Sequence, residues 1–330
     1  MTNSGILLDC GPSLRGWSNQ EDLLVCPYRW GRKNMVQDQI RVPSDPLVKG
    51  SLGHAGLAHF WSIRIAEMQG QKNHGLLDPS SAIAALAAQE DHKIAAVRGY
   101  GNVWQPHVAL AQQMVDRYAA VDPYRALRPI AVEYHVSLWV DRDASGRWAF
   151  VAPPWDATER EKLAREGRWA EFYARGAPWL STFRADLIAQ EPSGAFVVVD
   201  HKTGYKNDAR KQQGFVSSGQ MIQFQHWGQL AYGASWGGVH VAFISWREIG
   251  NASGASSRSS TSRAFESFRV ASLPETVFDM PRQIAMRAES HARLMAVEPD
   301  WRMWPKALVE SGSCAGKYGD CDLKVSCCGG

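Results

Sequence analysis

The stretch "RADLIAQEPSGAFVVVDHKTG", residues 184–204, contains two aspartates and a lysine at a spacing that could perform metal-dependent chemistry. Its central Pro-Ser-Gly predicts a hairpin, and side chains alternate faces along each strand. Asp200 and Lys202 then share one face, while His201 points the other way. A hairpin centred on the turn places Asp186 directly opposite Asp200. Opposed side chains have Cβ atoms roughly 4.5–5.5 Å apart, close enough for two carboxylates to hold one cation.

Two buried carboxylates repel each other, so one takes up a proton unless a cation lies between them. Oxygen ligands with room for water suit Mg²⁺ or Mn²⁺. The alternative is an ordinary salt bridge between Asp200 and Lys202 at a strand end, with Asp186 solvated. We favour the metal site because Asp200 ends a continuous apolar run and Thr203-Gly204 turns immediately after it. The prediction depends on register, since a one-residue slip would move Asp186 to the opposite face.

The first 120 residues are predicted to be almost entirely helical. In "HAGLAHFWSIRIAEM", apolar residues recur at helical spacing, and His54 begins the buried face. β-Branched and aromatic runs then predict strands, with a helical insertion at residues 156–176. The strands are expected at residues 129–141, 147–153, 180–190, 195–202, 239–248 and 265–273. Helices are expected at residues 219–236 and 274–297.

Composition excludes several classes of protein. The chain has 330 residues, of which 45% are hydrophobic and 21% charged, as in ordinary globular proteins. No apolar run approaches the roughly 20 residues that a membrane helix needs, and the start "MTNSGILLDCGPS" lacks the pattern of an export signal. We therefore expect a cytoplasmic protein with no membrane partner. The net charge of +3 does not by itself imply a polyanion partner.

"STFRADLIA" followed by "FVVVDHKTG" resembles the nuclease core of the PD-(D/E)XK superfamily, specifically the RecB-like exonucleases and related CRISPR-associated and bacteriophage nucleases. In that core an acid in one strand precedes an acid-x-Lys in the next, commonly followed by Thr-Gly. "GSLGH", residues 50–54, is similar to the Gly-x-x-x-His that supplies a histidine ligand at a helix start. "QFQHWGQLAYG" resembles the Gln-Tyr helix downstream, although Gln229 and Tyr232 stand one residue closer than the most familiar spacing. The matches span most of the chain in the family's order.

The resemblance implies an α/β, restriction-endonuclease-like fold, in which a mixed central sheet is flanked by helices. It divides the chain into a mainly helical N-terminal segment at residues 1–125, a nuclease core at residues 126–300 and a cysteine-rich tail at residues 301–330.

The resemblance also implies roles for individual residues. His54, Asp186 and Asp200 would ligate the metal, together with the backbone carbonyl of His201. Lys202 would hold or help activate a water molecule and stabilise the transition state. Considered without the resemblance, a satisfied core histidine is the favoured interpretation of His54.

Six further residues are candidates for contact with nucleic acid. Three share a helix face at i, i+4 and i+7, and three are basic residues beside a tyrosine in the loop after the lysine. They are Gln225, Gln229 and Tyr232, and Lys206, Arg210 and Lys211. The alternatives are a solvated helix face and a solvated loop. Glu133 could support the ligands as an outer acid, although we favour a strand-edge glutamate.

The cysteines predict a second metal site. Four of the six lie in the last seventeen residues, and without an export signal a metal site is preferred to disulfides. Four thiolates suit an iron-sulfur cluster or a structural zinc, and the resemblance favours 4Fe-4S. Our assignment is Cys26, Cys314, Cys321 and Cys327, with Cys10 and Cys328 spare, although Cys328 could replace Cys327.

Together these features predict a metal-dependent DNA nuclease, an exonuclease acting on single-stranded or frayed ends. Its partners would be DNA and proteins of recombination, replication or CRISPR adaptation, in a phage or a prokaryote. One alternative is a non-catalytic, nuclease-like subunit that binds DNA. Another is a protein with a structural zinc tail and no nucleic-acid role.

Overall fold

The computed structural model describes most of the chain between residues 26 and 303. The described residues are 6–8, 26–34, 42–71, 75–151, 179–205, 209–216, 218–251, 264–270, 279–298, 300–303, 315–316 and 319–320, with isolated residues between 159 and 171. Most of the expected helical insertion at 156–176 and the Gly/Ser-rich linker after residue 251 lie outside them.

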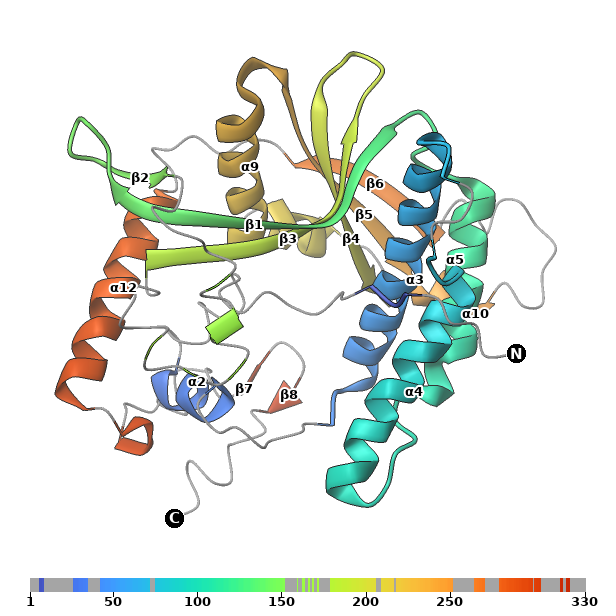
Figure 1. Cartoon of the computed structure of the whole chain (residues 1–330), viewed down its shortest axis with the longest axis horizontal. Coiled ribbons are helices and arrows are strands. Elements are labelled where there is room, and N and C mark those ends of the chain that lie inside the picture. Colours follow the sequence, from blue (N-terminus) through green and yellow to red (C-terminus); the bar gives the residue numbers. More distant parts are fainter. Residues whose placement is uncertain are drawn as a thin grey trace. The chain divides into compact units, whose positions relative to one another are not determined.

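The first third of the described chain is helical, as the sequence predicts. Its helices are α2 (Pro27–Asn34), α3 (Asp45–Met68), α4 (Pro79–Arg98) and α5 (Val108–Val121). Both α3 and α4 begin with proline in their first turn, and the side chain of Asp78 accepts a hydrogen bond from the N–H of Ser81. Figure 1 shows α3, α4 and α5 side by side.

Six strands form one mixed sheet in the order β2-β1-β3-β4-β5-β6. Their bounds are β1 (Arg128–Arg142), β2 (Trp148–Val151), β3 (Leu180–Gln190), β4 (Phe196–Gly204), β5 (Trp236–Ser245) and β6 (Phe265–Val270). β4 and β5 run parallel, while the pairs β1–β2, β3–β4 and β5–β6 are antiparallel. This mixed sheet with flanking helices confirms the α/β prediction.

Two boundaries differ from the sequence prediction for physical reasons. β5 begins at Trp236, because the helix before it, α9 (Gly219–Tyr232), ends at Gly233 with positive φ. β5 also ends at Ser245, and the next residues form α10 (Trp246–Asn251) instead of extending the strand. The last long helix, α12 (Met280–Val297), begins after Asp279, whose side chain accepts from the N–H of Arg282.

The register between β3 and β4 is the one the hairpin predicts. Leu187 lies opposite Val199, so Asp186 and Asp200 come next in line. The two faces of β4 meet different helices. Lys202 contacts Gln220 of α9 on one face, while His201 contacts Tyr118 of α5 on the other.

A large apolar core lies between α3, α4, α5 and the strands β3, β4 and β5. Leu52 and Trp61 of α3 are almost completely buried in it. A Cβ atom at Gly53 would lie 2.7 Å from Cε of Met114, so the absence of a side chain lets α3 lie close to α5. Deep burial of α3 fixes the position of His54, the residue after Gly53.

The chain forms two compact units. The first comprises residues 1–11, 40–135 and 184–273, and the second residues 12–39, 136–183 and 274–330. In the second unit, Trp148 of β2 stacks on Trp179 with ring centroids 5.5 Å apart. No described helix is long and apolar enough to cross a membrane.

Candidate active site

Asp186 lies at the centre of the candidate site, in the first unit. Its Oδ2 accepts a hydrogen bond from the backbone N–H of His201 at 2.7 Å and lies 3.4 Å from Nδ1 of His54. The predicted pairing of His54 with Asp186 is therefore present. His54 is not at a helix start, however. Helix α3 begins at Asp45, nine residues earlier, with Pro46 in its first turn.

Glu133 of β1 completes a cluster with these two residues. One ligand atom each from His54, Glu133 and Asp186 lie within 4.8 Å of one another. Glu133 has φ of 49°, although it lies inside a strand. Left-handed backbone in a non-glycine residue costs about 1–2 kcal/mol and re-aims the side chain. The sequence analysis favoured a strand-edge glutamate at 133. The structure instead places Glu133 beside His54 and Asp186, closer to the alternative of an acid that supports the ligands.

Asp200 belongs to a second group, on the α9 side of β4. It is completely buried, and its Oδ2 lies 2.7 Å from Nζ of Lys202. Gln220 joins the two, because its Oε1 accepts from Lys202 Nζ at 3.0 Å and its Nε2 donates to Asp200 Oδ1 at 3.3 Å. Three side chains therefore hold one another in a closed ring. The sequence analysis missed Gln220, although Ser218 predicts a helix start two residues before it.

The two acids have opposite electrostatic character. Burial raises the pKa of Asp200 to about 6 despite the attraction of Lys202, and the charge of Asp186 adds to the rise. Burial also acts to raise the pKa of Asp186, but His54 and the hydrogen bond from His201 outweigh it and hold that pKa well below its usual range. Burial lowers the pKa of His54, which keeps its imidazole neutral and able to bind a metal.

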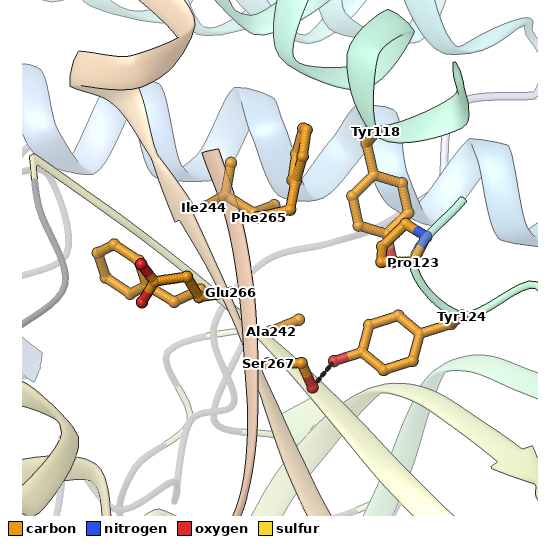
Figure 2. Close-up of a pocket in the computed structure, with 9 residues that line it drawn as sticks. Tyr118, Pro123, Tyr124, Ala242, Ile244, Phe265, Glu266 and Ser267 are labelled. Carbon is orange, nitrogen blue, oxygen red and sulfur yellow. Dashed lines mark hydrogen bonds between the residues drawn. The ribbon is translucent and has the colours of Figure 1, made fainter. Parts of the chain in front are cut away.

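His201 is anchored from behind by a tyrosine. Its Nε2 lies 3.0 Å from the hydroxyl of Tyr118, and both side chains are buried. The cavity beside Tyr118 is lined mainly by apolar groups from β5 and β6, and Figure 2 shows Tyr124 reaching Ser267 across it at 2.7 Å. None of the acids described above, and not Lys202, lines this cavity, so we assign it to packing.

The α9 residues predicted to contact nucleic acid have other partners. Gln225 donates to the carbonyl of Val270 and accepts from Nε1 of Trp236, both at 2.9 Å. Tyr232 stacks on Phe196 with centroids 4.3 Å apart. Phe196 begins β4, about 13 Å along the strand from Asp200. Gln225 and Tyr232 therefore stabilise the packing of α9, and neither touches Lys202. Gln229 is exposed.

The basic loop and the cysteines are described only in part. Arg210 is exposed and Lys211 half-buried, both in α8 (Ala209–Val216), while Lys206 lies outside the described residues. Cys26 is buried at the start of α2, where its Sγ accepts from the N–H of Arg29 at 3.4 Å. The other predicted cluster ligands, Cys314, Cys321 and Cys327, lie outside the described residues, as do Cys10 and Cys328.

Asp186 of β3 and the Asp200-x-Lys202 of β4 lie on neighbouring strands of the mixed sheet. Asp200 is not among the three clustered ligand residues, so the sharing of one cation by Asp186 and Asp200 stays a prediction. The sequence profile of the PD-(D/E)XK nuclease superfamily matches residues 17–327, and the chain belongs to this superfamily. Its members are generally phosphodiester-hydrolysing nucleases that typically use Mg²⁺ or Mn²⁺. A comparison with curated proteins found no match.

The residues present fit a divalent cation. The cluster of His54, Glu133 and Asp186 offers one imidazole nitrogen and two carboxylates within a single ion's reach. When bound, such an ion stabilises negative charge on a phosphate and activates water. The protein itself keeps Asp186 ionised and His54 neutral. A hydrogen bond from the backbone of His201 fixes Asp186, and one to Gln220 fixes the ammonium of Lys202.

Proposed function

We propose that the protein is a Mg²⁺- or Mn²⁺-dependent DNA nuclease that degrades single-stranded or frayed ends. The observation that carries the proposal is the ammonium of Lys202, 2.7 Å from Asp200 on the strand next to Asp186. A solvated strand-end salt bridge would leave both partners exposed. Here Asp200 is fully buried. Burying a carboxylate costs free energy even when it is paired, and buried acids with a raised pKa and a charged partner cluster at functional sites.

The proposed roles combine the resemblance with the observed cluster. The resemblance makes His54, Asp186, Asp200 and the carbonyl of His201 ligands of the metal, and the cluster adds the carboxylate of Glu133. Asp200 is the ligand that must lose a proton, because its pKa is about 6. The Lys202 side chain is 24% exposed, so its ammonium can reach a substrate phosphate and stabilise the charge that develops on it.

The catalytic proposal is tested with end-labelled single- and double-stranded DNA in Mg²⁺, Mn²⁺ or EDTA. Wild-type protein should cut only with metal, and Lys202→Ala should lose cleavage by about 10²-fold or more while its circular dichroism is unchanged. Lys93→Ala is the matched control, because Lys93 is an exposed lysine of α4 that pairs with Glu90. Equal cleavage by wild type and Lys202→Ala would remove Lys202 from the mechanism.

Exonuclease action rests on the resemblance of "GSLGH" and "DHKTG" to RecB-like exonucleases. It requires free ends, so covalently closed single-stranded circles should resist the enzyme while linear strands of the same sequence are shortened from an end. Cleavage of circles would make the protein an endonuclease. DNA binding with no cleavage under any metal would favour the non-catalytic, DNA-binding subunit.

We also propose that Cys26 binds an iron-sulfur cluster with Cys314, Cys321 and Cys327. Support comes from the position of Cys26, which is buried directly before α2, where its Sγ accepts a hydrogen bond from the N–H of Arg29. Anaerobically purified protein should contain iron and acid-labile sulfide, and Cys26→Ser should lose both. Stoichiometric zinc in place of iron would assign a structural zinc site.

A further inference from the structure

Tyr205 is an exposed aromatic residue immediately beyond the catalytic strand. It follows Gly204, the last residue of β4, and is 65% exposed. It stands three positions after Lys202, a span of about 10 Å at most. A large aromatic ring that faces solvent this close to the site has no role in the core.

The position of Tyr205 is fixed by its neighbours. Its carbonyl accepts a hydrogen bond from the hydroxyl of Ser245 at 2.8 Å, and Ser245 is buried at the end of β5. The guanidinium carbon of Arg247, in α10, lies 5.7 Å from the centroid of the Tyr205 ring. Arg247 is itself exposed. The aromatic ring and the cation therefore form a pair on a rigid base.

A second cation lies on the other side of Gly204. A Cβ atom at Gly204 would lie 3.0 Å from Nζ of Lys211 and 2.8 Å from Cζ of Phe243. The ammonium of Lys211 is also 5.4 Å from the centroid of the Phe243 ring. The approach of this ammonium to Gly204 places a second positive charge beside the backbone between Lys202 and Tyr205.

We propose that Tyr205, Arg247 and Lys211 form a subsite for one unpaired nucleotide next to the scissile phosphate. The base stacks on the Tyr205 ring, and the two cations neutralise the phosphates on either side of it. An exposed ring with flanking cations is the combination that a single strand requires, because every base has a π-face and every phosphate a charge. The inference rests on the proposed nuclease function and extends it to a specific substrate geometry.

The subsite selects single strands or frayed ends over intact duplex. A base in a duplex is already stacked on its neighbours and has no face to offer, so it must first be unpaired. The subsite therefore provides a physical reason for the preference for unpaired ends, which the fold alone does not give.

A double-mutant cycle between protein and DNA tests the subsite without catalysis. Fluorescent single-stranded oligonucleotides, each with one abasic nucleotide at a successive position from the end, are bound to the full-length protein in EDTA and in Ca²⁺. Wild type is compared with Tyr205→Ala, Tyr205→Phe and Arg247→Ala. Tyr100→Ala is the matched control, because Tyr100 is 56% exposed but lies in the loop after α4.

We expect one abasic position to weaken wild-type binding by about 5- to 150-fold, the range for loss of one base stacked on an aromatic side chain. Tyr205→Ala should weaken binding to the intact strand by the same factor and become insensitive to that abasic position. Tyr205→Phe should behave as wild type, and Tyr100→Ala should not change binding. Arg247→Ala should weaken all strands and reduce the slope of log affinity against log salt by about 1.

Two outcomes separate the failure of this subsite from the failure of the function. If wild type cuts end-labelled DNA but Tyr205→Ala keeps the full sensitivity to every abasic position, the subsite is refuted and the nuclease stands. If wild type neither binds nor cuts DNA with any metal, the proposed function itself is refuted.

Discussion

Replacing Asp200 by asparagine should stabilise the metal-free protein while abolishing its activity. The pKa of Asp200 rises from 3.8 to about 6 on folding, a difference of about 2 units. At 1.36 kcal/mol per unit, ionising this carboxyl at neutral pH costs the folded state roughly 3 kcal/mol. Asparagine has nearly the same shape and no charge, so it removes this cost.

The sign of the pH dependence follows from the raised pKa. The contribution of Asp200 to stability is fully present below pH 4 and is lost as pH rises through about 6. The gain in Asp200→Asn therefore appears at pH 7.5 and vanishes at pH 4. The pKa of Asp200 already includes the attraction of Lys202, but the asparagine amide cannot accept at both oxygen positions as the carboxylate does. We therefore expect a net gain of about 1–2 kcal/mol, or about 2–8 °C in Tm.

Asp186→Asn provides an internal control of opposite sign. The pKa of Asp186 is held below its usual range, so its carboxylate stabilises the fold above that range, and its loss should lower Tm at pH 7.5. The assay is thermal unfolding by circular dichroism in EDTA at pH 4, 5, 6 and 7.5. A Tm for Asp200→Asn below that of wild type at pH 7.5 would refute the electrostatic reasoning.

Three further predictions concern the same site. Glu133→Gly should raise Tm, because glycine relieves about 1 kcal/mol of backbone strain, yet weaken Mn²⁺ binding by about tenfold or more in calorimetric titrations. Mn²⁺ affinity of wild type should fall by up to about tenfold per pH unit below pH 6, as Asp200 takes up its proton, and Asp200→Asn should lose this slope. Gln220→Ala should lower kcat more than it changes KM, because it loosens Lys202 without removing a metal ligand, and Gln220→Glu should not restore the rate. An unchanged kcat would show that the closed ring of Asp200, Lys202 and Gln220 is dispensable.

Much of the sheet follows from the sequence. The turn residues set the centre of the β3–β4 hairpin, and the alternation of side chains then places Asp186 in line with Asp200. The pairing of His54 with Asp186 was also predicted, through the resemblance, and the buried stripe of α3 explains it.

The contributions of Glu133 and Gln220 could not be predicted in the same way. A strand pattern assumes regular backbone, and nothing in "AVEYH" signals a left-handed residue at 133. The rotation of α9 about its axis is decided by packing around Trp227 and Trp236, which turns Gln225 inward and leaves Gln220 to meet Lys202. Helical periodicity shows which residues share a face but not what that face will contact.

The scattered origin of the site also bears on how the protein is made. His54, Glu133, Asp186 and Gln220 come from four separate stretches, so a ribosome must release the first 220 residues before the charges can assemble. A translation product or a proteolytic fragment that ends before Gln220 lacks part of this constellation.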